Sequence, residues 1–150
     1  MNDKKQTLVL FNTLNKTLES FKPINEIVKI YTCGPTVYRD AHIGNMRTYL
    51  LSDTLKKTLI HIGYKTLHVK NITDVGHMRQ EMLDQGEDKV IAAAIKEGKT
   101  PQEIASYYTD KFLKDEKSLN INPPDYMPKA TDHINEMLEM IDILIQKKIA

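Results

Sequence analysis

The sequence predicts an α/β fold with a parallel sheet, and three stretches in its first half carry that prediction. Residues 27–32 have the side-chain alternation of a strand, residues 46–62 have apolar positions at helical spacing, and residues 64–73 return to period two. Strand, helix and strand with short connections form a βαβ unit, so we expect parallel strands and a right-handed crossover. We therefore assign residues 1–75 to the first half of such a fold and residues 76–150 to a mainly helical continuation.

The chain before this unit is expected to carry no chemistry. Residues 7–12 are a short apolar run suited to an edge strand, and residues 13–21 are polar and turn-like. Together they suggest an N-terminal hairpin. In the strand at 27–32, one face would carry Val28, Ile30 and Thr32.

The stretch from residue 30 to residue 47, IYTCGPTVYRDAHIGNMR, organises the rest of the chain. The strand breaks at Cys33-Gly34-Pro35, where neither a strand nor a helix continues comfortably. A short loop then leads to His42-Ile43-Gly44-Asn45, and the helical pattern starts at Met46. A strand, a glycine-containing loop and a helix start form a place where phosphates bind, because free backbone N–H groups and the positive end of the helix dipole meet there.

The spacing of apolar residues predicts the helix and the second strand of the unit. We expect the buried stripe of the helix to consist of Leu51, Leu55, Leu59 and Ile62. Gly63 suits a left-handed C-terminal cap. In the following strand, Leu67 and Val69 oppose His68 and Lys70. The ends of both strands, at Cys33 and at residues 71–74, should face one crevice.

The second half of the chain reads as helices. Residues 76–86 form a polar loop, and residues 87–97 an alanine-rich helix that ends at Gly98. Thr100-Pro101-Gln102-Glu103 is a strong helix start with an N-cap, a first-position proline and a glutamate at the third position. The buried stripe of that helix is Ile104, Tyr108 and Phe112.

The end of the chain combines a proline-rich connection with one more helix. Residues 120–129 contain three prolines and should be non-helical. A last helix starts near Thr131 and places five apolar residues on one face: Ile134, Met137, Leu138, Ile141 and Ile145. Charged pairs at Lys56-Lys57 and Lys147-Lys148, and the charge run at residues 84–89, are expected to face solvent.

Composition limits the function classes. The chain has 150 residues, 41% hydrophobic and 27% charged, with a net charge of +1, so one domain is expected and global charge does not indicate a nucleic-acid binder. A single cysteine allows no intrachain disulfide and fits a reducing cytoplasm. No apolar run reaches membrane-spanning length, so no membrane partner is expected.

The segments CGPTVY at residues 33–38 and HIGN at residues 42–45 resemble the signature region of the class I aminoacyl-tRNA synthetases, most closely the cysteinyl-tRNA synthetase family. HIGN is similar to the HIGH motif of that class. The resemblance implies a Rossmann-like nucleotide-binding fold, of which this chain would be the N-terminal half. It also implies ATP-dependent activation of L-cysteine, with Mg²⁺, and transfer of the cysteine to tRNA-Cys.

Cys33 is the candidate metal ligand. A lone cysteine at a strand end is more often a small buried hydrophobe. The resemblance instead implies a zinc ion held by this cysteine with Cys, His and Glu ligands from later in the chain, which binds the thiolate of the substrate. Zinc suits a soft thiolate far better than a hydroxyl, so the metal would supply specificity. The remaining ligands are not recognisable in this sequence.

His42, Gly44 and Asn45 are the candidate ATP-binding residues, with His42 and Asn45 in the catalytic role. Donors at a helix N-terminus stabilise charge that develops on phosphate oxygens, and a neutral imidazole and an amide can both donate. Gly44 would allow close approach of the nucleotide. The alternative is that His42 and Asn45 merely cap the helix.

The candidate substrate-binding residues are Gly34, Thr36 and Thr73. Thr73 lies in Asn71-Ile72-Thr73-Asp74, which resembles the NITD segment of the family, and by position it would touch the amino acid. The alternative is a polar strand end that satisfies its own backbone. The family usually continues with Asp-Asp-Lys after Val75, whereas this chain has Gly76-His77.

No KMSKS-like stretch and no anticodon-binding domain can be recognised in the sequence. We therefore expect the N-terminal part of a truncated or split synthetase, completed by a C-terminal chain. Two alternatives remain open: a related ligase that joins cysteine to an amino-sugar thiol precursor, and a non-catalytic nucleotide-binding or assembly module. The resemblance covers nearly all 150 residues.

Overall fold

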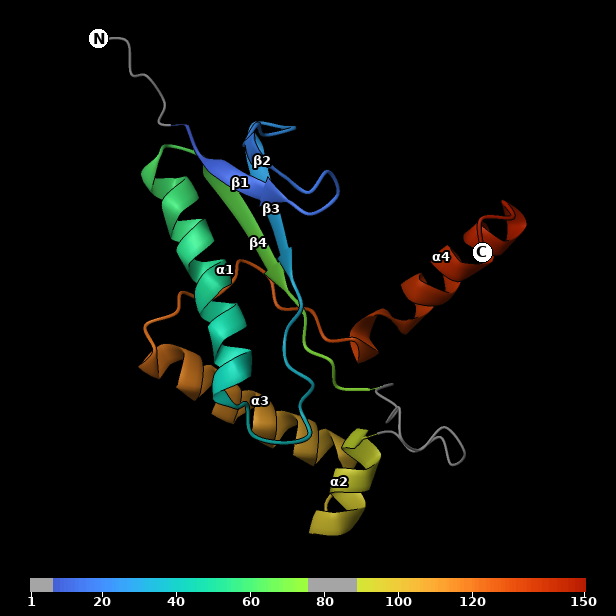
Figure 1. Cartoon of the computed structure of the whole chain (residues 1–150). Helices are drawn as coiled ribbons and strands as arrows, with labels where there is room; N and C mark the ends of the chain where they lie inside the picture. The colour runs from blue at the N-terminus through green and yellow to red at the C-terminus, as the bar shows by residue number, and fades with distance from the viewer. Residues whose placement is uncertain (1–6, 76–88) are drawn as a thin grey trace.

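A computed structural model describes residues 7–75 and 89–150 and confirms the predicted α/β class (Figure 1). Two short sheets and four α-helices make up the described chain. In chain order the elements are β1 (Val9–Asn12), β2 (Thr17–Ser20), β3 (Ile27–Thr32), α1 (Ile43–His61), β4 (Lys65–Lys70), α2 (Lys89–Glu97), α3 (Pro101–Ser118), the 3₁₀-helix η2 (Thr131–His133) and α4 (Ile134–Gln146).

The central unit is β3–α1–β4, and its two strands are parallel as predicted. The register runs from Ile27 beside Lys65 to Thr32 beside Lys70. Val28 and Ile30 of β3 are buried and pack with Leu59 of α1. Because α1 returns the chain antiparallel to the strands, its N-terminus lies at the end of the molecule where both strands finish (Figure 1).

The N-terminal hairpin is present, with one correction. β1 and β2 pair antiparallel, so the stretch at residues 13–21 that was expected to be turn-like contains a strand. Its side chains are mostly exposed, and for that reason the period-two signal is weak. The predicted polar loop at 76–86, Gly76-His77 and most of the charge run at 84–89 lie outside the described residues.

The proline-rich connection is non-helical as predicted, but it also continues the sheet. The backbone N of Lys70 donates to the carbonyl of Tyr126 at 3.0 Å, and the N of Ile72 donates to the carbonyl of Pro128 at 2.8 Å. This edge pairs parallel with β4 and with the residues just beyond it. A third, strand-like segment therefore pairs with β4. It was not predicted, because its three prolines are unfavourable for a strand.

Helix α1 differs from its prediction in start and buried face. It begins at Ile43 rather than Met46, so HIGN forms its first turn. Leu51, placed in the buried stripe, is 70% exposed, whereas Lys56, expected in solvent, is 7% exposed. The Lys56 ammonium lies 3.1 Å from Asp125 Oδ2, which lies in the connection. The inner face of α1 is partly polar because it holds that connection by this ion pair and by a hydrogen bond from the backbone N of Asn122 to Asp53 Oδ1.

Helix α3 matches its prediction. Thr100 and Glu103 form the expected capping box, and Pro101 occupies the first turn. Ile104 and Phe112 are buried, and Tyr108 is half-buried beside them. Near the N-terminal end of α1, six side chains form the main core: Val37, Met46, Tyr49, Ile72, Phe112 and Ile121. The main core thus combines residues that follow both strands with residues of α1 and α3.

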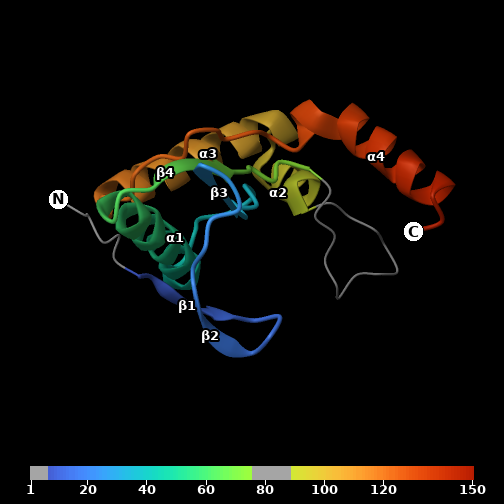
Figure 2. The ribbon, with the colours of Figure 1, turned by 90° about the horizontal axis from the view of Figure 1, so that it is seen from above.

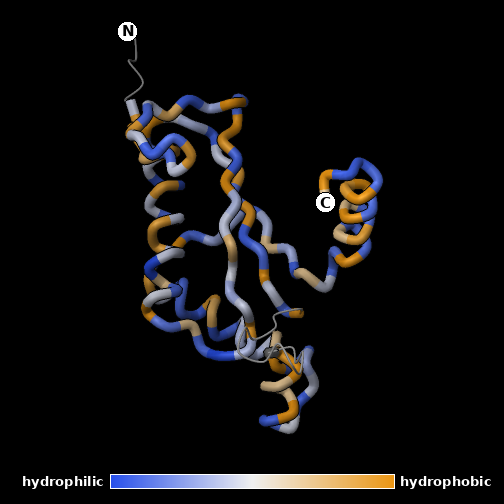
Figure 3. The backbone as a smooth tube through the Cα atoms, turned by 45° about the vertical axis from the view of Figure 1, so that its right-hand side comes forward, coloured by the Kyte–Doolittle hydropathy of each residue, from blue (hydrophilic) through white to orange (hydrophobic). Residues whose placement is uncertain are grey.

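Helix α4 projects from the rest of the described chain (Figures 1 and 2). Figure 3 shows apolar residues repeated along it. All five residues of its predicted apolar face are at least 42% exposed. None of the described helices combines the length and apolar character needed to cross a bilayer.

His68 is a buried titratable side chain in β4, 2% exposed, and in the described chain its Nδ1 atom has no hydrogen-bond partner. Burial is the main cause that lowers the pKa of His68. The ammonium groups of Lys56 and Lys70 lower this pKa further. The carboxylates of Asp125 and Asp53 act in the opposite direction without reversing the shift.

We expect the free energy of unfolding to fall as the pH drops below about 6.5, the ordinary pKa of histidine. Below that pH the unfolded chain binds a proton at His68 more readily than the folded chain does. The contribution of His68 to the free energy of unfolding is therefore fully present above that pH and is lost as the pH falls below it. Urea unfolding at several pH values measures the slope. His68→Gln is the control: its amide can keep the 2.8 Å contact with Thr32 Oγ1 but does not titrate. An equally steep slope in the variant would contradict the assignment to His68.

Candidate active site

The two strand ends are hydrogen-bonded to each other, as the parallel topology predicts. Thr36 and Thr73 form an isolated parallel bridge. The backbone N of Thr73 donates to the carbonyl of Pro35 at 3.0 Å, and the N of Val37 donates to the carbonyl of Thr73 at 3.1 Å. The loop after β3 is therefore bonded to the segment after β4, which places the candidate substrate residues Thr36 and Thr73 side by side.

Cys33 and Gly34 lie at the start of this junction. The thiol of Cys33 is exposed, with Sγ 3.5 Å from the carbonyl oxygen of Gly34. A Cβ atom on Gly34 would overlap the backbone carbonyl oxygen of Asn71. Only glycine allows this approach, which brings the N–H of Gly34 to 3.0 Å from Asn71 Oδ1. Asn71 is not among the site residues that the sequence predicts.

His42 and Asn45 build a capping box at the start of α1. The N–H of Gly44 donates to His42 Nδ1 at 3.1 Å, and the N–H of His42 donates to Asn45 Oδ1 at 3.1 Å. Each side chain thus uses an acceptor atom for the cap. A neutral imidazole that accepts at Nδ1 carries its proton on Nε2, and Asn45 keeps its NH₂ group. Capping and donation to a ligand are therefore compatible.

A cavity of about 230 Å³ lies beside this helix start. It is lined by the loop at residues 35–41 and by Asn45, Tyr49, Tyr108 and Phe112. Burial is the main cause that raises the pKa of Tyr49 to about 12, so the phenol stays a neutral donor. Among the predicted site residues, Thr36 and Asn45 line this cavity, whereas Cys33, His42 and Thr73 do not. The aromatic lining was not predicted, because Tyr49 and Tyr108 occupy ordinary helical core positions.

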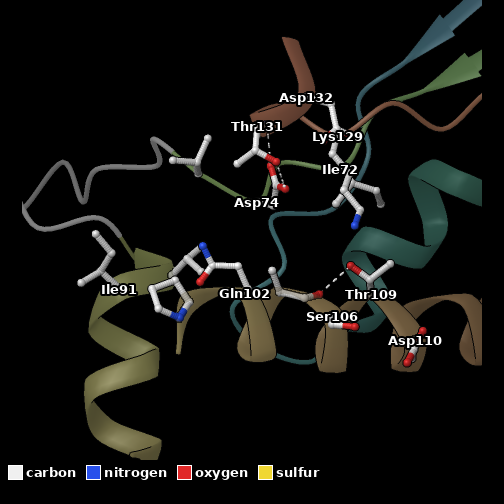
Figure 4. A pocket seen from close by; sticks show the side chains of 14 residues that line it. Ile72, Asp74, Ile91, Gln102, Ser106, Thr109, Asp110, Lys129, Thr131 and Asp132 are labelled. Atoms are coloured by element: carbon white, nitrogen blue, oxygen red, sulfur yellow. Dashed lines mark hydrogen bonds between the residues drawn. The ribbon is translucent and has the colours of Figure 1, made fainter. Parts of the chain in front are cut away.

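A larger cavity, of about 490 Å³, is lined by the segment after β4, by α2 and α3, and by residues 129–132 (Figure 4). Ile72 and Asp74 line it, together with residues of α3 such as Gln102 and Thr109. The carboxylate of Asp74 accepts from Thr131 N at 3.0 Å and from Thr131 Oγ1 at 2.6 Å. Thr73, which lies between Ile72 and Asp74 in the chain, does not line this cavity.

The described residues do not form the zinc site that the resemblance implies. Among them no group of three or more His, Cys, Asp or Glu side chains could hold a metal ion. A zinc site with protein ligands requires at least three. The described part of the chain therefore offers Cys33 as one donor and does not form a complete site.

The fold and this helix start define a class of protein. The structure resembles a chain in the crystal structure of the ternary complex of Agrobacterium radiobacter K84 LeuRS with tRNA and LeuAMS, with a TM-score of 0.62 at 21% identity, over 80% of this chain and 14% of that one. The described chain thus has the fold of a class I aminoacyl-tRNA synthetase.

Sequence comparison gives the family. Residues 20–150 match the model described as the class I (C) tRNA synthetase catalytic domain, and the chain belongs to that family. A cysteine–tRNA ligase of Treponema denticola is 52% identical over 136 residues, which cover 90% of this chain and 27% of the relative. A cysteine–tRNA ligase of Borreliella afzelii is 47% identical over 142 residues, 95% and 29% of the two chains. The chain thus spans less than a third of the length of these relatives.

Proposed function

We propose that this chain is the N-terminal part of a cysteine–tRNA ligase and contributes one side of its active site. In the proposed reaction, a carboxylate oxygen of cysteine attacks the α-phosphate of ATP. A new P–O bond forms, the bond to pyrophosphate breaks, and a terminal hydroxyl of tRNA-Cys later displaces AMP from the adenylate. The observation that carries this proposal is the capping box of α1, which leaves a hydrogen-bond donor on both His42 and Asn45.

The phosphates of ATP would lie at the N-terminus of α1. Backbone N–H groups and the helix dipole favour negative charge there. His42 Nε2 and the Asn45 amide would add two side-chain donors to oxygens that gain charge as pyrophosphate leaves. The cap holds both side chains in place before substrate binds, so little reorganisation accompanies the reaction.

Cysteine would lie at the junction of the strand ends, beside Gly34, Thr36 and Thr73. Cys33, exposed at the same junction, would supply one ligand to a zinc ion whose other ligands come from beyond the described residues. When bound, such an ion favours a thiolate over a hydroxyl and so selects cysteine.

Cysteine-dependent ATP–pyrophosphate exchange tests the proposal. We expect the isolated chain to show no exchange above background, because the phosphates must be held from more than one side. Adding the remaining C-terminal portion of the Treponema denticola relative should restore exchange. His42→Ala should then lower the restored rate about a hundredfold or more, the typical effect of losing one such donor.

Binding of the two parts to each other is the control for this experiment. The variant should associate with the C-terminal portion as tightly as the wild-type chain, which analytical ultracentrifugation measures. Robust exchange by the isolated chain would contradict the half-site proposal. Unchanged exchange by His42→Ala in the restored pair would remove His42 from the phosphate site.

Zinc content provides a separate prediction. We expect the purified chain to retain well under one zinc ion per molecule after mild dialysis, because the described residues offer Cys33 alone as a donor to such a site. Mass spectrometry of metals measures the ratio, and Cys33→Ser should leave it unchanged. Stoichiometric zinc would show that further ligands exist in this chain, and His77 would be the first residue to substitute.

A further inference from the structure

The side chain of Asn71 is the centre of the hydrogen bonds at the strand ends. Its Oδ1 atom accepts from Gly34 N at 3.0 Å and from Tyr31 OH at 3.1 Å. Its Nδ2 atom donates to Thr73 Oγ1 at 3.0 Å. One side chain thus connects the end of β3, the loop that carries Gly34 and the candidate substrate residue Thr73.

The orientation of this amide is fixed by chemistry. A backbone N–H can only donate, so Gly34 requires the oxygen of Asn71 on its side. Turning the amide over would set the NH₂ group against that N–H and leave a half-buried donor unpaired, at a cost of about 1–3 kcal/mol. The NH₂ group must therefore point toward Thr73.

The fixed amide determines what the Thr73 hydroxyl can do. A hydroxyl has one proton and two acceptor lone pairs, and the amide of Asn71 can only donate to it. The proton of Thr73 is then left for another acceptor, and the described residues provide none for it. By alternation, Thr73 and Asn71 lie on the face opposite Ile72, which belongs to the core. The loop after β3 is bonded to the backbone of Thr73 at the edge of this segment.

We propose that Asn71 is a positioning residue that holds the Thr73 hydroxyl as a hydrogen-bond donor toward the carboxylate of an amino-acid substrate. This inference rests on the proposed function for the identity of the ligand, but the polarity of the hydroxyl rests on the geometry alone. Asn71 acts through Thr73 and is not assigned a contact with substrate.

Asn71→Asp tests the polarity, because it keeps the shape of the side chain and still accepts from Gly34 and Tyr31. The oxygen that replaces the NH₂ group can only accept, so the Thr73 hydroxyl must turn and donate to it. We expect binding of L-cysteine, followed through the backbone amide resonance of Thr73, to weaken about tenfold to a hundredfold, as for loss of a hydrogen bond to a charged group. Thr73→Val should weaken it similarly, and Thr73→Ser should bind like the wild type.

The double variant separates this mechanism from simple charge repulsion. If the new carboxylate acts through Thr73, Asn71→Asp combined with Thr73→Val binds no more weakly than either single variant. A further tenfold loss in the double variant, or wild-type affinity in Asn71→Asp, would overturn the inference. Circular dichroism should show an intact fold in every variant.

A second measurement needs no ligand. The side-chain NH₂ resonances of Asn71 should exchange slowly with solvent in the wild type and in Thr73→Ser, and should shift and exchange faster in Thr73→Val. Unchanged resonances in Thr73→Val would overturn the positioning role. A lack of response to L-cysteine both in the isolated wild-type chain and in the restored pair would contradict the proposed function and the ligand assigned to Thr73. The Asn71 resonances would still decide whether the amide holds that hydroxyl.

Discussion

Gly34→Ala is expected to destabilise the chain by about 3 kcal/mol or more, at the upper end of the range for overpacking. The new Cβ would overlap the backbone carbonyl oxygen of Asn71, and a backbone atom cannot move aside by changing rotamer. The loop after β3 would have to separate from the segment after β4. The hydrogen bonds around Thr73 and the bond from Gly34 to Asn71 would be lost together. Urea unfolding measures the free energy.

Gly63→Ala is the matched control for this substitution. Gly63 has a φ of +90° and no atom within 4 Å of a Cβ built on it. Alanine there introduces backbone strain of about 1 kcal/mol without any overlap. A substantially larger effect at Gly34 would identify overlap as the cause, whereas equal effects would show that the junction of the strand ends can rearrange at little cost in free energy. Cysteine binding should be lost in Gly34→Ala and retained in Gly63→Ala.

Local patterns predicted the elements of the βαβ unit, but not which polar side chains the fold buries. Alternation located β3 and β4, and capping chemistry located the start of α3 and the end of α1. The burial of Lys56 could not be predicted in this way. It depends on Asp125, 69 residues further along the chain, and no local periodicity encodes a contact at that distance.

In the candidate site, too, some features could be predicted from the sequence and others depend on the folded backbone. The parallel topology was enough to predict that the two strand ends meet, and the structure brings Thr36 and Thr73 together. The two interpretations of His42 and Asn45 turned out to be compatible, because each side chain has a separate acceptor and donor. The role of Asn71 escaped prediction because it depends on the exact approach of Gly34, which only the folded backbone defines.

A large loss of stability is also expected for Lys70→Met. Lys70 and Glu116 form an ion pair in which the side chains are 1% and 5% exposed, and the Lys70 ammonium lies 5.1 Å from the centre of the Tyr49 ring. Removing the lysine leaves a buried carboxylate without its counter-charge, which typically costs about 3–5 kcal/mol. Thermal and urea unfolding would measure this loss. It should also loosen the attachment of α3 to the sheet, because Glu116 lies on α3 and Lys70 on β4.

The pH dependence and a double variant distinguish loss of the charge pair from loss of packing. Burial already raises the pKa of Glu116, against the opposing effect of Lys70, so in Lys70→Met this pKa should rise further. The folded variant then binds a proton that the unfolded chain releases, and the deficit in stability should shrink as the pH falls toward the ordinary carboxyl pKa of about 4.3. Lys70→Met combined with Glu116→Met should recover most of the loss, since a buried ion pair is often replaceable by apolar side chains. A deficit that is independent of pH and persists in the double variant would mean that the lysine stabilises this core by its packing against Tyr49 and Phe112, and that its charge contributes little.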